Sequence, residues 1–261
     1  MTGRVTQWRQ DGFLVLPSFK PPAAIAALRT RSLAIVDALV IDGALPVFST
    51  RDRQRVADAA LLASADKVHC FFEEDAVDAE GRLVVPKDQA VNKIGHALHD
   101  LDPVFERFSR DPALAELARD LGLERALLMQ SMLIFKQPRI GGEVNWHQDA
   151  SFLATDPHSV IGFWFALEDA TRDNGCLWVE PGGHRGPLRE RYGRTAEGLK
   201  MARLDDTPWP VASRTVALEV PAGTLVVFDG MLPHASAVNR SAQSRMAYTL
   251  TWWTQRRPGR L

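Results

Sequence analysis

The sequence predicts an α+β fold: a double-stranded β-helix, or cupin-like jelly roll, with helices packed outside one sheet. Beyond residue 125, short β-rich runs alternate with turn clusters such as residues 172–175 and 181–183, a pattern typical of antiparallel jelly rolls. Residues 1–125 carry mainly helical patterns. No repeat or Gly/Ser linker divides the chain. We therefore expect one domain over residues 1–261, helix-rich in 1–125 and with its main jelly-roll strands in 126–254.

The first part of the chain contains three kinds of expected element. Apolar runs bounded by turn residues predict strands, and apolar periodicity after proline or aspartate predicts helices, with Asp111 as one N-cap. The expected elements are a strand at 12–17, helices at 21–39 and 53–63, a hairpin from 69–72 and 83–85, and helices at 89–101 and 112–121. On the helix at 89–101, His96 and His99 would share one face, where packing is favoured over metal binding.

The second part contains four apolar, strand-like runs, at residues 128–135, 160–167, 224–228 and 245–253. Segment 185–214 interrupts them, because it is polar and too long for a simple turn. Loops of this length are usually functional or mobile. An arginine-rich loop would favour an anionic substrate such as a carboxylate, phosphate or CoA ester, although a simply solvated loop is the alternative. Its arginines are Arg185, Arg189, Arg191, Arg194, Arg203 and Arg214.

The composition excludes several classes of function. Hydrophobic residues make up 46% of the chain, and 31 basic against 32 acidic residues give a net charge of −1. This balance offers no global attraction to nucleic acid or an anionic membrane. The first ten residues lack the apolar core of a signal peptide, and no apolar run approaches the roughly 20 residues of a membrane span. Two cysteines, Cys70 and Cys176, are too few for a disulfide framework. We expect a cytoplasmic protein.

Two histidines and an aspartate form the most informative pattern. His147 and Asp149 flank Gln148, and His234 follows a later strand-like run. On a strand, residues i and i+2 point to the same side, so His147 and Asp149 can reach one ion while Gln148 points elsewhere. This is the ligand set of non-haem Fe(II) oxygenases, which leaves coordination positions open, although zinc would bind the same atoms.

A possible carboxylate clamp lies downstream of this pattern. Arg245 begins the last strand-like run, eleven residues after His234. Its guanidinium fork can bind a carboxylate bidentately, and a surface salt bridge is the alternative. Ser236 shares the face of His234 and could add a hydrogen bond.

Long motifs then identify a family. The chain resembles the phytanoyl-CoA dioxygenase family of Fe(II)/2-oxoglutarate oxygenases over about residues 10–254. The motifs that carry the resemblance are NKIGHALH at 92–99, QSMLIFKQP at 130–138, GGEV at 141–144, HQDASFL at 147–153, ALEDA at 166–170 and NGCLW at 174–178.

The resemblance implies a jelly roll in which His147, Asp149 and His234 bind Fe(II). It also implies a 2-oxoglutarate pocket lined by Lys93, Met132, Gln148, Trp164, Ser236 and Arg245. Without the resemblance, Lys93 would be expected in solvent and Trp164 in the core.

The implied activity uses dioxygen to hydroxylate a small-molecule or acyl-type substrate, with release of succinate and CO2. Related halogenases carry a small residue where this chain has Asp149, so its carboxylate favours hydroxylation. Two alternatives stay open: a cupin-like metal enzyme that does not use 2-oxoglutarate, and a non-enzymatic 2-oxoglutarate-binding or sensory protein.

Overall fold

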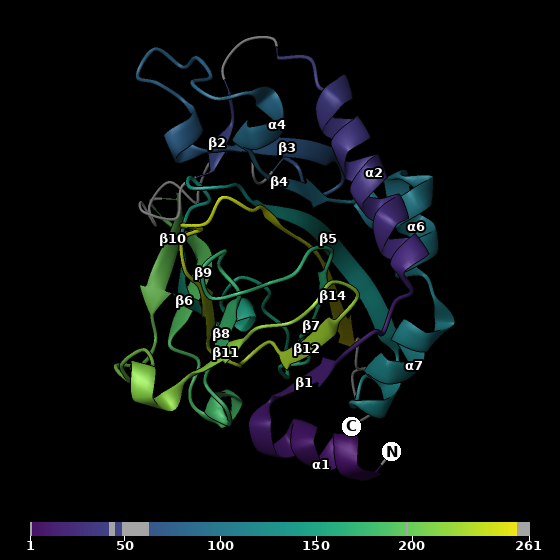
Figure 1. Cartoon of the computed structure of the whole chain (residues 1–261). Coiled ribbons are helices and arrows are strands. Elements are labelled where there is room, and N and C mark those ends of the chain that lie inside the picture. Colours follow the sequence, from purple (N-terminus) through teal and green to yellow (C-terminus); the bar gives the residue numbers. More distant parts are fainter. Residues whose placement is uncertain (1, 42–44, 49–62, 197, 255–261) are drawn as a thin grey trace.

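The structure, a computed structural model, describes residues 2–41, 45–48, 63–196 and 198–254 (Figure 1). Its largest sheet has eight strands in the order β1-β12-β7-β14-β5-β4-β3-β2, antiparallel except for the β2–β3 pair. These strands are β1 (Phe13–Leu16), β2 (Val47–Phe48), β3 (Val68–Glu73), β4 (Val91–His96), β5 (Ala126–Lys136), β7 (Ile161–Ala166), β12 (Leu225–Asp229) and β14 (Arg245–Thr254).

A smaller sheet faces the large one. It has the order β11-β8-β13-β6, and a separate hairpin joins β9 to β10. The strands are β6 (Val144–His147), β8 (Leu177–Val179), β9 (Glu190–Thr195), β10 (Gly198–Arg203), β11 (Val216–Leu218) and β13 (His234–Ser236). Two facing antiparallel sheets confirm the predicted double-stranded β-helix.

Helices cover the outer face of the large sheet, as predicted; α2, α6 and α7 lie along it in Figure 1. The helices are α1 (Thr2–Asp11), α2 (Pro22–Ala38), α4 (Lys87–Ala90), α5 (Leu98–Leu101), α6 (Pro103–Ser109) and α7 (Pro112–Asp120). Short 3-10 turns are η2 (Glu74–Ala76), η3 (Asp149–Ser151), η4 (Gly183–Arg185) and η5 (Ala212–Arg214). Within the described ranges, no helix has both the length and the apolar character needed to cross a bilayer.

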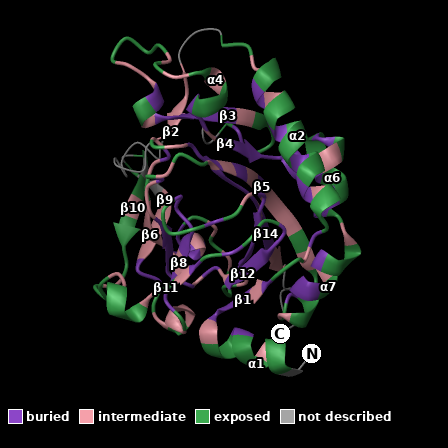
Figure 2. Cartoon of the chain, in the orientation of Figure 1, coloured by how far each residue is buried: buried purple, intermediate pink, exposed green. Residues whose placement is uncertain are grey.

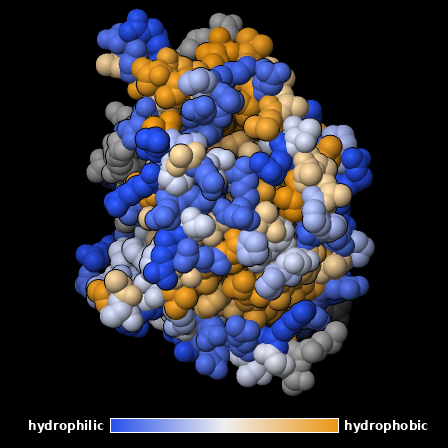
Figure 3. Space-filling view, in the orientation of Figure 1, coloured by the Kyte–Doolittle hydropathy of each residue, from blue (hydrophilic) through white to orange (hydrophobic). Residues whose placement is uncertain are grey.

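Strand alternation divides the interior into two cores. On β7, Phe163 and Phe165 pack with the helices, whereas Trp164 and Ala166 pack with the smaller sheet. Successive side chains of a strand point to opposite faces, so a sheet covered on both sides needs apolar residues at every position. This explains why β7 is buried throughout and why the neighbouring strands β12 and β14 are mostly buried in Figure 2. On the outer surface, polar and apolar side chains are interspersed (Figure 3).

Most predicted elements are confirmed. The runs at 12–17, 128–135, 160–167, 224–228 and 245–253 correspond to β1, β5, β7, β12 and β14, and those at 21–39 and 112–121 correspond to α2 and α7. The Asp111 side chain caps α7 by accepting a hydrogen bond from Ala113 N. Cys70 and Cys176 are buried and form no disulfide.

Three predictions need correction. The helix at 89–101 is wrong, because its middle, residues 91–96, is β4, which pairs with β3 and β5. The hairpin from 69–72 and 83–85 is reduced to one bridge, Val77 to Leu83, since β3 pairs with β4 instead. Segment 185–214 is not simply a loop, because it forms the β9–β10 hairpin. The predicted helix at 53–63 falls almost entirely outside the described residues.

Candidate metal and carboxylate site

The smaller sheet brings His147, Asp149 and His234 together. His147 ends β6, directly opposite His234, the first residue of β13. Asp149 begins η3 after Gln148, whose backbone is still extended, so the alternation continues past the end of the strand. The Nε2 atoms of His147 and His234 each lie 3.7 Å from Asp149 Oδ1, and one ligand atom from each residue fits within 4.8 Å. Among the described residues, this is the single group with such geometry.

Backbone carbonyls fix both imidazole rings in the orientation that a metal requires. His147 Nδ1 donates to Asn145 O at 2.8 Å, and His234 Nδ1 donates to Leu232 O at 3.0 Å. A carbonyl only accepts, so each Nδ1 carries the proton and each Nε2 keeps its lone pair. Burial raises the pKa of Asp149, although nearby His234 lowers it in part. A cation bound at this point would favour the ionised carboxylate. The donor set therefore fits a divalent transition metal.

Arg245 forms a second buried group, with Ser236 and Trp164. Its Nε donates to Gly175 O at 3.2 Å, and its Nη2 donates to Ser236 Oγ at 3.2 Å. The guanidinium carbon lies 5.5 Å from the Trp164 ring centroid. Nη1 is buried and has no hydrogen-bond partner. Burial lowers the pKa of Arg245 to about 10, which leaves it charged at neutral pH. A buried cation with an unpartnered N–H suits a carboxylate ligand.

Lys93 is buried, contrary to what its residue type alone suggests. It lies on β4 opposite Ile134 of β5. Its Nζ sits 3.1 Å from the Phe48 ring centroid and 5.6 Å from that of Phe71. Burial lowers the pKa of Lys93 to about 7, because the ammonium loses hydration without gaining a counter-ion.

A cavity of about 440 Å³ opens beside the metal candidates, within the size range of small-molecule sites. Lys93, Met132, His147 and Asp149 line it. Trp164, Ser236 and Arg245 do not contribute to this lining. Lys136 connects the two regions, because it lines the cavity while its Nζ donates to Ser236 O at 3.2 Å.

Gln148 points away from the cavity. Its Nε2 donates to Pro187 O at 3.1 Å and to Met231 O at 2.8 Å. Its Oε1 accepts a hydrogen bond from Arg189 N at 3.0 Å. The structure therefore places Gln148 as alternation suggested, tying neighbouring backbone segments together rather than contacting the pocket that the resemblance implied.

Two buried charged residues, Lys136 and Glu73, also line the cavity. Lys136 is 1% exposed, and its Nζ donates to Gly142 O, Ser236 O and Ala237 O. Glu73, at the end of β3, is 3% exposed, and burial raises its pKa to about 7. The alternation of side chains along a strand identifies both residues as inward-facing. That alternation can be applied only once the strands and their register are known.

The cavity lining includes none of the arginines of segment 185–214 whose side chains the structure describes. Arg185 donates to the backbone of Arg9 and Gln10, while Arg189 and Arg214 both pair with Glu180. This hairpin segment instead contributes Glu190, Tyr192 and Met201 to the lining. The expectation of an anionic substrate stays a prediction.

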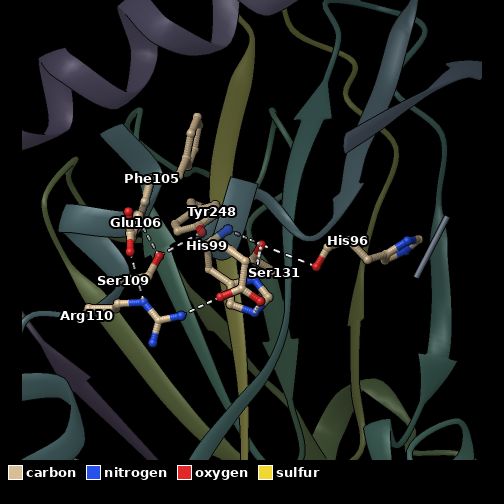
Figure 4. A network of polar contacts seen from close by, with 9 residues as sticks. His96, His99, Phe105, Glu106, Ser109, Arg110, Ser131 and Tyr248 are labelled. Atoms are coloured by element: carbon tan, nitrogen blue, oxygen red, sulfur yellow. Dashed lines mark hydrogen bonds and ion pairs between the residues drawn. The ribbon is translucent and has the colours of Figure 1, made fainter. Parts of the chain in front are cut away.

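His96 and His99 belong to two different environments, not to one helix face (Figure 4). His96 Nδ1 lies 2.9 Å from Ser64 Oγ, and His99 Nδ1 lies 2.9 Å from Ser131 Oγ. Burial lowers the pKa of His96 to about 4. Both rings therefore serve packing and hydrogen bonding.

Comparisons with known proteins agree with this geometry. A family model described as phytanoyl-CoA dioxygenase (PhyH) matches residues 8–247. Phytanoyl-CoA dioxygenase 1 of Oryza sativa subsp. japonica is 45% identical over 242 residues, covering 92% of this chain and 84% of that protein. Phytanoyl-CoA dioxygenase domain-containing protein 1 of Bos taurus is 39% identical over 258 residues, covering 94% and 87%.

A solved structure shares the fold. EctD from S. alaskensis, with 2-oxoglutarate and 5-hydroxyectoine, has a TM-score of 0.63 and 21% identity, covering 97% of this chain and 76% of that one. This likeness shows the fold alone. The family model and the relatives extend over nearly the whole chain, including every candidate residue described above. The protein belongs to the phytanoyl-CoA dioxygenase family.

Proposed function

We propose that the protein is an Fe(II)- and 2-oxoglutarate-dependent dioxygenase that hydroxylates a small or acyl-type molecule. The observation that carries this proposal is the convergence of three metal-ligand side chains, with both imidazoles held in the coordinating tautomer. Arg245 supports the proposal because its buried Nη1 has no hydrogen-bond partner, and a bound carboxylate would supply one. The EctD structure in complex with 2-oxoglutarate supports the same assignment by analogy of fold.

Each residue has a defined task in this proposal. His147, Asp149 and His234 would hold Fe(II). Arg245, assisted by Ser236 and the Trp164 ring, would bind the far carboxylate of 2-oxoglutarate. Iron and 2-oxoglutarate together supply dioxygen activation, in which 2-oxoglutarate becomes succinate and CO2 while the substrate is oxidised.

The remaining pocket residues shape the cavity around the reacting groups. Lys93 and Met132 line it and limit the entry of water. A charged Lys93 would also attract the dianionic cosubstrate. Gln148 would act by holding the backbone on both sides of the metal ligands, since its own polar atoms are engaged elsewhere. The carboxylate of Asp149 supports hydroxylation over halogenation, because it occupies a coordination position.

Succinate release tests the proposal. The purified protein, loaded anaerobically with Fe(II) and given 2-oxoglutarate, air and a broad metabolite mixture, should release succinate. His147→Ala should abolish the release, whereas His158→Ala, which removes an exposed histidine, should leave it unchanged. Metal-dependent turnover without 2-oxoglutarate would favour the cupin-like alternative. Tight 2-oxoglutarate binding with no succinate from any mixture would favour the sensory alternative.

A further inference from the structure

We infer that the primary substrate carries a protonated amine on an apolar body and that Glu73 binds this amine. This inference rests on the proposed function, because it concerns the substrate side of the same cavity. It names a class of substrate opposite in charge to the anionic one that the arginine-rich segment suggested.

Glu73 has the geometry of a ligand-binding carboxylate. It ends β3, lines the cavity and is 3% exposed. Its Oε2 accepts a hydrogen bond from Gly142 N at 3.3 Å, which fixes the carboxyl group, while Oε1 is buried and has no hydrogen-bond partner. A buried polar atom without a partner costs free energy that a bound donor recovers. The side chain is therefore held in place with one oxygen ready to accept.

The charge of Lys136 acts on Glu73, but Lys136 does not donate to that oxygen. Its ammonium donates to the carbonyls of Gly142, Ser236 and Ala237, which uses all of its N–H groups. Burial raises the pKa of Glu73 most, and the Asn92 side chain, the Gly142 backbone N–H and Lys136 lower it in part. Asn92 therefore contributes to holding the carboxyl group, but Oε1 accepts no hydrogen bond from the described residues. A bound cation would recover the most energy at that oxygen.

The rest of the wall defines the body of the substrate. Phe152 lies between the metal candidates and the β9–β10 hairpin, with its ring 6.2 Å from that of His147 and 6.0 Å from that of Tyr192. Trp146, Met201 and Ile134 add further apolar surface. Aromatic faces stabilise cations as well as apolar groups, so an amine attached to an aromatic or aliphatic skeleton matches both features.

The test compares three probes of one shape and different charge. Phenylpropylamine, phenylpropanol and phenylpropanoate would be titrated by calorimetry into the full-length protein loaded with Mn(II) and 2-oxoglutarate under anaerobic conditions. Wild-type protein should bind the amine at least about tenfold more tightly than the alcohol, with the carboxylate weakest. Equal binding of all three, or preference for the carboxylate, would overturn the inference without any variant being needed.

Matched variants test whether Glu73 is the residue that binds the amine. Glu73→Gln should remove the amine preference, while Glu74→Gln, the same change at the next lining residue, should alter it by less than about threefold. Glu73→Asp, which keeps the charge, should retain part of the preference. If Glu73→Gln keeps full amine affinity, the amine binds elsewhere, for example on the metal, and the inference fails. Affinity for 2-oxoglutarate, measured on the same samples, reports folding of the variants and tests the proposed function separately.

Discussion

The proposed binding of 2-oxoglutarate depends most on the side chain of Arg245. Its unpartnered Nη1 would gain a charge-assisted hydrogen bond from a carboxylate, worth about 1.5–3 kcal/mol. We expect Arg245→Ala to weaken 2-oxoglutarate binding by roughly 10- to 100-fold, measured by anaerobic calorimetry with Mn(II). Ser236→Ala should have a smaller effect, because Ser236 only positions the guanidinium. Unchanged affinity in Arg245→Ala would remove the clamp from the proposal.

Lys93 should make cosubstrate binding pH-dependent. Its pKa is about 7, so the ammonium is progressively lost above neutrality. Because only the charged form attracts 2-oxoglutarate, we expect wild-type affinity to fall as the pH rises above 7. Lys93→Met should bind more weakly at low pH and show a flatter profile. Parallel profiles for the two proteins would show that Lys93 does not contact the cosubstrate.

Burial of Lys93 should also make the stability of the folded protein depend on pH. The folded-state pKa of Lys93, about 7, lies below the ordinary 10.5. The unfolded chain therefore binds more protons between these values, and Lys93 opposes folding most below pH 7. Thermal unfolding should show that Lys93→Met raises Tm at neutral pH and that the gain disappears as the pH approaches 10.5. A constant gain at all pH values would point to packing alone.

Individual residues of the site were predicted with uneven success. The spacing of His147 and Asp149 was enough to place them together, because strand alternation is a local property. The burial of Lys93 and Glu73 was not visible, because it depends on which strands become neighbours. The sequence motif also could not show that Gln148 makes three hydrogen bonds to two backbone segments distant in sequence.

At the level of elements, β4 shows why local patterns fail. Residues 91–96 mix apolar and polar side chains without strict alternation, and the segment follows a helical turn, α4. Its strand conformation is fixed by pairing with β3 and β5, on opposite sides. Such long-range pairing overrides weak local preference. The terminal strands β1 and β14, and helices α2 and α7, have clear boundaries in the sequence and were predicted.

Helix α6 was not predicted, and its N-cap is testable. Asp102 Oδ1 accepts hydrogen bonds from Val104 N and Phe105 N, and Oδ2 accepts one from Arg31 Nε at 2.6 Å. We expect Asp102→Ala to lower the free energy of unfolding by about 1–2 kcal/mol in urea titrations. Asp102→Asn keeps a capping oxygen and should lose roughly half as much. Equal losses would assign the stabilisation to the ion pair with Arg31, not to the cap.

For the whole molecule, the sequence predicted the class of fold but not its assembly. Apolar runs and turn clusters indicated a jelly roll. They did not show that β1 to β4 extend the large sheet at both of its edges. That arrangement pairs β4, with Lys93, with the much later strand β5, and pairs β3, with Glu73, with β4.

The shared core leads us to expect that the helices and the large sheet unfold as one unit. Phe165 is fully buried and packs against Phe108 and Phe19, with ring centroids 4.9 and 6.4 Å away. We expect Phe165→Ala to cost about 3–5 kcal/mol of stability while circular dichroism and tryptophan fluorescence still report one transition. Phe152→Ala, at a 39% exposed position, should cost less than about 1.5 kcal/mol. Separate transitions in the core variant would contradict the shared unit.

The hydrogen bonds of Gln148 have a consequence for how this protein can diversify. All three are made to main-chain atoms, two of them at residues 187 and 189, just before the β9–β10 hairpin. Main-chain groups are present whatever side chains the hairpin carries. Glu190, Tyr192 and Met201 can therefore be exchanged during evolution while the hairpin stays anchored next to the metal ligands. A descendant could acquire a new substrate by changing the hairpin and leave its iron chemistry untouched.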